Sequence, residues 1–324
     1  MTTAITIICL LFILSCEDEK DEPNPKIELV KGDATVTIPK FIKDNPHIII
    51  SLLFLDFDLY EPTKAAIDYL VPRMPKGGVL VFDEINNLKT DDKVLLSFDY
   101  GPSTKPEIHP MTIALLKHLF AHDIKIYATA LWPDGTFMST QAFSEVAHDF
   151  GKEYGIDYVN LGFRPGAEAV VKGIASNIPT LYTIDVRGTS INDIPMMKDI
   201  INIKDFDFVF SLSAGFPGTT EWVQFACDPN NIPLSTGLTS VMVTDIVPYV
   251  DSGQIRGILA GMPGAAEYES LVNDELKKIN IDGKPGKATS MMAAQSIAHV
   301  IIVIFIIFGN ITYYLTRKNQ RKEN

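Results

Sequence analysis

From residue 93 onward the chain alternates short apolar runs with segments of helical periodicity. The apolar runs cover residues 94–101, 124–132, 157–163 and 207–215, and helical segments at 110–123, 137–154, 168–178 and 219–226 lie between or after them. Continuous apolar runs of this length are typical of strands buried on both faces, and intervening helices allow neighbouring strands to run parallel. The predicted fold class is therefore α/β, with a mainly parallel, doubly wound sheet or sheets.

The same alternation begins closer to the N-terminus, where an apolar run at 47–58, a helical segment at 62–70 and a second strand at 77–84 predict a βαβ unit. A chain of 324 residues holds about two domains at roughly 150 residues each. The predicted organisation is a leader and linker (1–25), a partial βαβ segment (26–90), an α/β domain (91–263), a stalk (264–295), a transmembrane helix (296–315) and a basic tail (316–324).

Charge and cysteine content exclude two classes of function. The chain has 28 Lys and Arg against 40 Asp and Glu, a formal net charge of −12, and carries no basic block before its last eight residues. Nucleic-acid binding is excluded because nothing can track a phosphate backbone. Cys9 and Cys16 lie near the N-terminus and Cys227 stands alone in the body, so we expect neither a disulfide framework nor a thiolate zinc cluster there.

Both ends of the chain suggest a membrane. The apolar run 5–15 is followed by Cys16 and by the acidic stretch 17–22, which resembles a bacterial lipoprotein leader and implies acylation of Cys16. Residues 1–4 contain no Lys or Arg, so an uncleaved apolar N-terminus is the alternative. The run 296–315 has the length of about 20 residues that a membrane-spanning helix needs.

Arg317, Lys318, Arg321 and Lys322 follow that run directly. The positive-inside rule then places the tail in the cytoplasm and the body outside a bacterial cytoplasmic membrane. His299 and Asn310 are polar groups within the single span, and we expect them to pack in a homo-oligomer through this helix.

Residues 52–86 carry an acidic strand end, Asp56-Phe57-Asp58, followed by a Gly-Gly turn and the acidic pair Asp83-Glu84. This segment resembles the macrocin-type O-methyltransferases, which use S-adenosylmethionine (SAM). The resemblance covers residues 26–88 and implies Mg²⁺ ligands at Asp56, Asp83 and Glu84, with Glu84 where the family usually has Asp, and Asp58 as the base. Only about 26 residues precede the match and none form a GxGxxG turn, so the SAM-binding half is missing.

Residues 93–315 resemble a family of bacterial membrane proteins of unknown function, which implies no activity. Candidates for a ligand site therefore come from strand ends, where doubly wound proteins bind their ligands. Asp99 and Asp185 end apolar runs, and Ser213 and Gly215 lie in a Ser/Gly-rich turn before a helix, an arrangement that can hold a small anionic ligand. The alternative is that tight strand-to-helix turns need glycine.

Two further features carry weaker signals. Asn160 and Arg164 flank a strand end and are candidates to line a pocket. His118 and His122 lie four residues apart on one helix face, but no third metal ligand is apparent in the sequence.

Three interpretations compete. The first is a membrane-tethered, extracytoplasmic α/β protein that binds a ligand or partner. The second is a metal-dependent O-methyltransferase using SAM, the only enzymatic activity that the sequence suggests. The third is a mosaic chain, joined near residues 26 and 90, without a joint function. We favour the first because it accounts for most of the chain.

Overall fold

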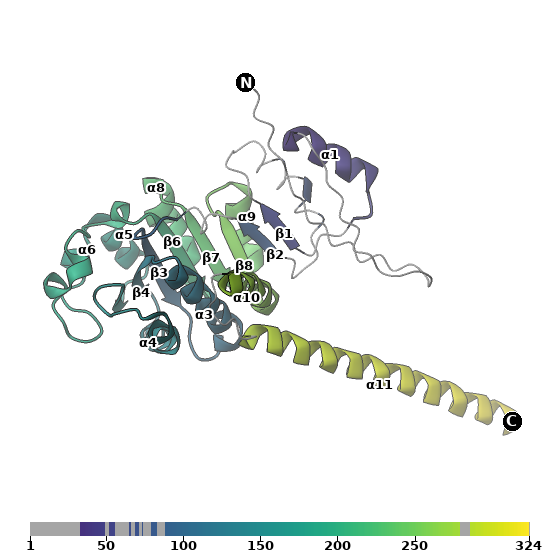
Figure 1. Ribbon diagram of the computed structural model, residues 1–324. Coiled ribbons are helices and arrows are strands. Elements are labelled where there is room, and N and C mark those ends of the chain that lie inside the picture. Colours follow the sequence, from purple (N-terminus) through teal and green to yellow (C-terminus); the bar gives the residue numbers. More distant parts are fainter. Residues whose placement is uncertain are drawn as a thin grey trace.

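The computed structural model describes residues 33–48, 52–55, 65, 69–70, 73, 79–82, 88–278 and 286–323 (Figure 1). The strands are β1 (Leu52–Leu55), β2 (Val79–Phe82), β3 (Lys93–Asp99), β4 (Lys125–Ala130), β5 (Tyr158–Phe163), β6 (Phe208–Ser213), β7 (Leu234–Leu238) and β8 (Gly257–Ala260). The longer helices are α1 (Ala34–Asp44), α3 (Lys105–Ala121), α4 (Gly135–Val146), α5 (Glu168–Ser176), α9 (Val243–Asp251), α10 (Gly261–Lys278) and α11 (Lys287–Glu323). The shorter ones are α6 (Ile178–Leu181), α7 (Thr219–Trp222), the π-helix Val223–Cys227 and α8 (Asp228–Asn230), with single 3₁₀ turns at Ala147–Phe150, Ile191–Asp193, Pro195–Met197 and Ile203–Asp205.

The described strands form one sheet in the order β1-β2-β8-β7-β6-β3-β4-β5. The six strands from β8 to β5 are all parallel. Numbered from β3 along the chain, these six have the order 3-2-1-4-5-6, which is that of doubly wound dinucleotide-binding folds. The predicted α/β class with a parallel sheet is therefore confirmed.

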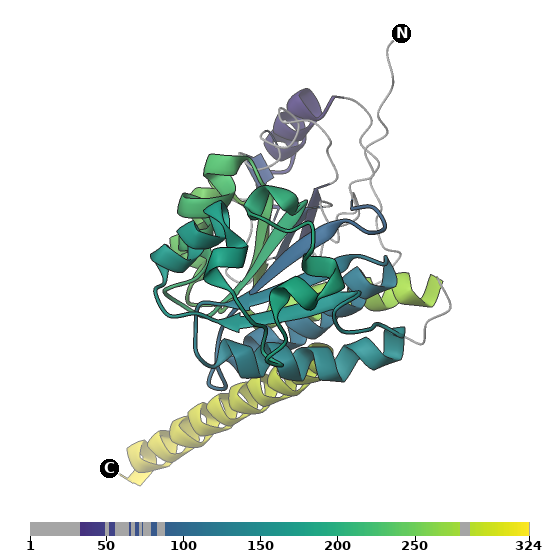
Figure 2. The same ribbon diagram turned by 90° about the vertical axis from the view of Figure 1, so that its left-hand side faces the viewer.

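Helices cover both faces of the sheet because its strands are apolar on both sides. In β3, Leu96 and Phe98 pack on one face with α3, α4 and α10, whereas Leu95 packs on the other with α5, the π-helix and α9. The same alternation runs through β4 and β6, where Tyr127 and Val209 lie on the Leu95 side. Figures 1 and 2 show the resulting three layers of helix, sheet and helix. Two hydrophobic cores follow from this arrangement, one on each face.

The N-terminal segment continues the same sheet. β1 and β2 pair in parallel over their four residues, and β2 runs antiparallel to β8, with Leu80 opposite Ile258. Helix α1 precedes them and begins at Asp33, whose side chain accepts a hydrogen bond from the Thr35 N–H. Asp33 thereby supplies the usual N-terminal cap of a helix. The βαβ-like segment and the body thus share hydrogen-bonded strands.

Residues 264–278, expected to begin a stalk, belong to α10 and pack against α3. Ala265, Tyr268, Val272 and Leu276 of α10 are all buried in the core on that face. Their spacing of three or four residues forms one helical stripe, so burial of that stripe explains why the segment is part of the domain. The stalk interpretation therefore does not describe this half of the segment.

Helix α11 follows and extends away from the sheet in both views (Figures 1 and 2). It contains the run expected to cross a membrane, yet within the described part of the chain no helix combines the length and the apolar character that a membrane span requires. Its exposed large apolar side chains are Met291 and those between Ile297 and Phe308, after which come Gly309 and Asn310. The predicted transmembrane helix is therefore not supported.

Candidate functional site

The sequence-predicted candidates Asp99, Ser213 and Gly215 meet at the point where the sheet reverses its winding. Asp99 ends β3 and Ser213 ends β6, and the two residues lie opposite each other in the parallel register. The Ala214 N–H donates to the Asp99 carbonyl at 3.0 Å. Connections leave these two strands toward opposite faces, which in doubly wound folds opens a ligand site at the carboxyl ends. Strand-end reasoning therefore brought together three of the four candidates.

The Asp99 carboxylate is fully buried and bonded to other groups of the protein. Its Oδ1 accepts from the Leu131 N–H at 2.7 Å, and its Oδ2 accepts from the Ser97 hydroxyl at 2.7 Å and from the Trp222 indole at 3.3 Å. Burial raises the pKa of Asp99 to about 7, although these three hydrogen bonds act in the opposite direction. Both carboxylate oxygens are thus used to hold the strand end together.

The turn after β6 folds back onto the strand that it leaves. The Ser213 hydroxyl donates to the Gly215 carbonyl at 2.9 Å, and the Trp132 indole donates to the Pro217 carbonyl at 2.7 Å, after a cis peptide bond between Phe216 and Pro217. A Cβ on Gly218 would lie 2.0 Å from the Ser213 hydroxyl oxygen, so only glycine fits there. The hydroxyl and glycines predicted to hold an anion therefore serve the internal structure of this turn.

Asp185, the fourth candidate, lies elsewhere, in a tight loop beside the outer strand β5. Its Oδ1 accepts from the backbone N–H groups of Arg187 and Thr189 at 2.9 and 2.8 Å, and its Oδ2 accepts from the Tyr154 hydroxyl at 2.6 Å. The Val186 N–H donates to the Asn160 carbonyl at 3.0 Å, which fastens the loop to β5. Asp185 therefore shapes the loop that carries Val186 and Arg187.

That loop, helix α4 and strand β5 line a cavity of about 280 Å³ that is open to solvent on one side. Hydroxyl, amide, aromatic and guanidinium groups line it, from Thr136, Thr140, Phe143, Ser144, Tyr154, Tyr158, Asn160, Val186 and Arg187. Thr136, Thr140 and Ser144 follow one another at four-residue intervals and so share a face of α4. The cavity thus combines an apolar wall with several groups that can hydrogen-bond a ligand, as small-molecule sites do.

Two polar side chains of the cavity differ in how far their hydrogen-bonding capacity is used. The Asn160 amide donates to the Ser139 hydroxyl at 2.8 Å and accepts from the Gly162 N–H at 3.0 Å, so it is fixed in place. The Arg187 guanidinium carbon lies 3.4 Å from the centre of the Tyr154 ring, and the group makes no hydrogen bond or ion pair with the described residues. Its donors therefore remain available to a ligand.

The charges of the groups that line the cavity favour a negatively charged ligand. The Tyr154 pKa lies above its ordinary value because the hydroxyl is buried and because it donates to the Asp185 carboxylate, so Tyr154 is neutral at pH 7. Asp185 is buried and directs both oxygens to the loop and to Tyr154. Among the residues that line the cavity, Arg187 alone carries a charge at pH 7.

Arg164, predicted to line a pocket with Asn160, is directed differently. Its guanidinium stacks on the Tyr182 ring at 5.0 Å, and its Nε donates to the Leu181 carbonyl at 3.4 Å. The arginine that lines the cavity with Asn160 is therefore Arg187, and not Arg164 as the sequence predicts. The signal that points to the cavity is the row of hydroxyl residues at four-residue spacing along 136–144, which sequence reasoning passed over.

The remaining candidates, Asp56, Asp58, Asp83, Glu84 and Cys16, lie outside the described residues. Comparison with known proteins finds no family model, no curated protein and no solved structure that matches the chain. The class of the protein therefore follows from its own fold, which is a doubly wound α/β domain with a cavity beside an outer strand. The resemblances noted in the sequence stay expectations.

Proposed function

We propose that this protein binds a small anionic molecule in the cavity between α4, β5 and the loop 185–189. The observation that carries the proposal is the Arg187 guanidinium, which stands at a cavity of about 280 Å³ without a hydrogen bond to the described residues. The planar guanidinium fork matches the two oxygens of a carboxylate or phosphate group. On the facing helix, the Thr136 hydroxyl accepts from the Phe163 N–H at 2.9 Å, so its own O–H can donate to a ligand oxygen. The Thr140 and Ser144 hydroxyls donate to backbone carbonyls of α4 and can only accept from a ligand.

The cavity volume limits the size of the ligand. Sites for drug-sized ligands occupy about 300–1,000 Å³, so a cavity of about 280 Å³ suits a molecule with one or two anionic groups and little else. Phe143 and Tyr158 stack on each other at 4.6 Å between ring centres and supply an apolar wall. We infer that the ligand has a short apolar part that rests on this wall.

Calorimetric titration of the full chain with inorganic phosphate and with succinate, and with glycerol as a neutral probe, tests the proposal. We expect heat with at least one of the two anions and none with glycerol, and we expect Arg187→Gln to weaken anion binding at least about tenfold, since a charge-assisted pair contributes about 1.5–3 kcal/mol. Arg164→Gln is the matched control because Arg164 also stacks on a tyrosine but does not line the cavity. Equal affinities in wild type and Arg187→Gln, or no heat with either anion, contradict it.

We further propose that α11 attaches the protein to a membrane. Ile301, Ile304, Phe305 and Phe308 are 46–69 % exposed, and Ile302, Ile306 and Ile307 place apolar groups on the other sides of the helix. A helix that is apolar all round is normally covered by protein or by lipid. Flotation of the full chain with phospholipid vesicles tests this, with Ile304→Lys/Phe305→Lys as the comparison. Loss of co-flotation in the double variant is expected, and concentration-dependent dimerisation without flotation would instead indicate a second copy.

The alternative of a metal-dependent O-methyltransferase gains no support from the described residues, because its expected Mg²⁺ ligands and base lie outside them. Magnesium-dependent binding of SAM to the full chain, abolished by Asp83→Ala, remains the result that would favour it.

A further inference from the structure

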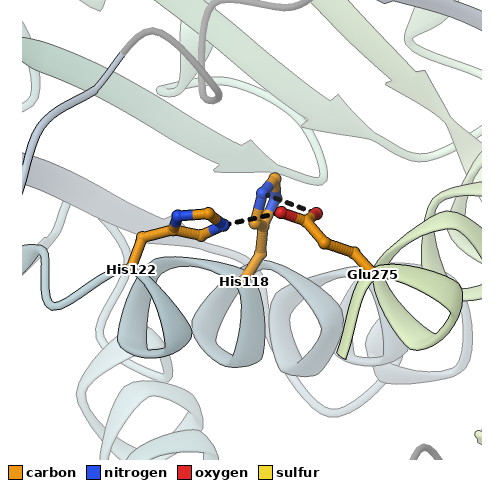
Figure 3. Close-up of side chains that lie close together, drawn as sticks. All are labelled: His118, His122 and Glu275. Atoms are coloured by element: carbon orange, nitrogen blue, oxygen red, sulfur yellow. Dashed lines mark hydrogen bonds and ion pairs between the residues drawn. The ribbon is translucent and has the colours of Figure 1, made fainter. Parts of the chain in front are cut away.

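A second polar cluster lies at the opposite end of the domain from Asp99, between the two helices α3 and α10. His118 and His122 lie in the last turn of α3 and on the residue after it, and Glu275 comes from α10 (Figure 3). The His122 Nε2 lies 2.7 Å from Glu275 Oε1, and the His118 Nε2 lies 3.3 Å from Glu275 Oε2. Two imidazoles and one carboxylate therefore point at a common centre.

From this convergence we infer that His118, His122 and Glu275 form a binding site for Zn²⁺ or a similar transition-metal ion. One donor atom from each residue lies within 4.8 Å of the others. Ligands around a tetrahedral zinc ion at 2.0–2.2 Å are about 3.4 Å apart, so the three groups need move little to close on an ion. Two histidines and one glutamate form one of the ligand sets that proteins use for zinc, with water in the fourth position.

One of the three ligands is also held by a hydrogen-bond partner. The His118 Nδ1 lies 2.8 Å from the Tyr268 hydroxyl, which leaves Nε2 as the atom that faces Glu275. Tyr268 and Glu275 are seven residues apart, two turns along the same face of α10. Histidine ligands of metals are usually held by such a partner on their second nitrogen, which fixes the orientation of the ring.

The three side chains of the cluster are buried to different extents, which leaves a path for an ion from solvent. The side chain of His118 is 7 % exposed, whereas those of His122 and Glu275 are 40 % and 33 % exposed, so the cluster is open on one side. Imidazole donors favour Zn²⁺, Ni²⁺ and Cu²⁺ over Mg²⁺ and Ca²⁺.

An ion at this position would fasten α10 to α3. The two helices already share a core, in which Tyr268, Val272 and Leu276 pack with Leu115 and Leu119. The cluster lies near the end of that contact, because Glu275 is three residues before the end of α10. Because the unfolded chain does not hold the three ligands together, binding stabilises the folded domain.

Equilibrium dialysis of the full chain after treatment with EDTA tests the site, with ZnSO₄ and MgCl₂ as the two probes. We expect the wild type to bind one more Zn²⁺ than His122→Ala or Glu275→Gln, with at least about 100-fold weaker binding at this site in either variant, and no comparable uptake of Mg²⁺. His148→Ala is the control, because the side chain of His148 is 99 % exposed and outside the cluster. Comparison of variants separates this site from zinc held elsewhere on the chain.

Thermal unfolding with and without ZnSO₄ provides a second test, which applies even if one variant folds poorly. Zinc should raise the Tm of wild type and His148→Ala, and it should leave the Tm of His122→Ala unchanged. Tyr268→Phe should weaken zinc binding about tenfold, as the loss of an outer hydrogen-bond partner does. Equal zinc stoichiometry and affinity in wild type and His122→Ala, or no rise in Tm with zinc, overturns the site.

Discussion

The carboxyl end of the central strands and the cavity beside β5 are both rich in polar groups, but they use those groups differently. At the end of β3, every carboxylate oxygen of Asp99 accepts a hydrogen bond from Ser97, Leu131 or Trp222. Beside β5, the Arg187 guanidinium has no such partner among the described residues. A polar residue at a strand end therefore indicates a ligand site only when its hydrogen-bonding capacity is left unused by the protein itself.

The largest expected effect tests the structural role of Asp99 through pH. Burial raises its pKa from 3.8 to about 7, so between these values the folded state keeps a proton that the unfolded chain has lost. The stability that Asp99 contributes is therefore fully present below about pH 4 and is lost as the pH rises to 7, by about 4 kcal/mol in unfolding free energy. Other carboxylates have their own pH dependence, so the comparison is with Asp99→Asn.

Urea unfolding at several pH values between 4 and 8 measures this difference. The two tryptophans of the chain, Trp132 and Trp222, both lie at this strand end and give the fluorescence signal. We expect the wild type to lose stability relative to Asp99→Asn as the pH rises from 4 through 7, with the loss levelling off by about pH 8. A difference that does not vary with pH would mean that Asp99 is already ionised throughout, as a residue open to solvent or ligand would be.

An intermediate effect is expected at Tyr154, which links the loop 185–189 to the body. Tyr154→Phe removes the hydrogen bond to Asp185 and should lower the unfolding free energy by about 1 kcal/mol. Because the loop carries Arg187, anion binding should weaken as well. Thermal unfolding and titration with phosphate or succinate measure the two effects. Tyr249→Phe, which removes an exposed hydrogen bond to Gln224, is the control and should leave binding unchanged.

The smallest expected effect on stability comes from Arg187 itself. Arg187→Ala removes a stacking contact of an exposed side chain, which contributes about 0.5–1 kcal/mol, so the Tm should change by little. The same substitution should abolish the anion binding proposed for the cavity. Loss of anion binding without loss of stability would show that Arg187 serves ligand recognition, whereas Asp99 serves the stability of the fold. A large loss of stability would instead place Arg187 among the structural residues.

Much of the fold follows from the sequence because apolar runs and strands coincide. β4, β5 and β6 lie within the runs predicted as strands, and β3 begins one residue before its predicted run, since both faces of each strand are buried. β7 was not predicted, because Ser235, Thr236 and Gly237 interrupt its apolar character. The Thr236 hydroxyl donates to the Ser211 carbonyl at 2.8 Å, and a Cβ on Gly237 would lie 2.5 Å from the Met111 sulfur. Contacts with neighbouring strands and helices require these residue types at these positions. The hydrophobic pattern within one segment carries no information about such contacts.

The site was predicted less well because long-range contacts assemble it. Asp99 and Ser213 were found together, since parallel strands place their carboxyl ends at one edge. The cavity depends on a loop that returns to β5, where Tyr154 reaches Asp185 across 31 positions of sequence. The metal ligand Glu275 lies 153 positions from His122. Local spacing identifies a pair such as His118 and His122, but only the packing of α10 on α3 supplies the third ligand.

The position of β2 also affects how the protein behaves in a crowded solution. Without β1 and β2, strand β8 would end the parallel sheet, and its free N–H and C=O groups would be available to pair with a strand of another molecule. β2 occupies that side of β8 in antiparallel orientation, and β1 pairs in turn with β2. The outermost strand is then β1, which has only four residues, Leu52–Leu55. Such a short terminal strand is a poor template for edge-to-edge aggregation, so the N-terminal segment protects the sheet from adding foreign strands.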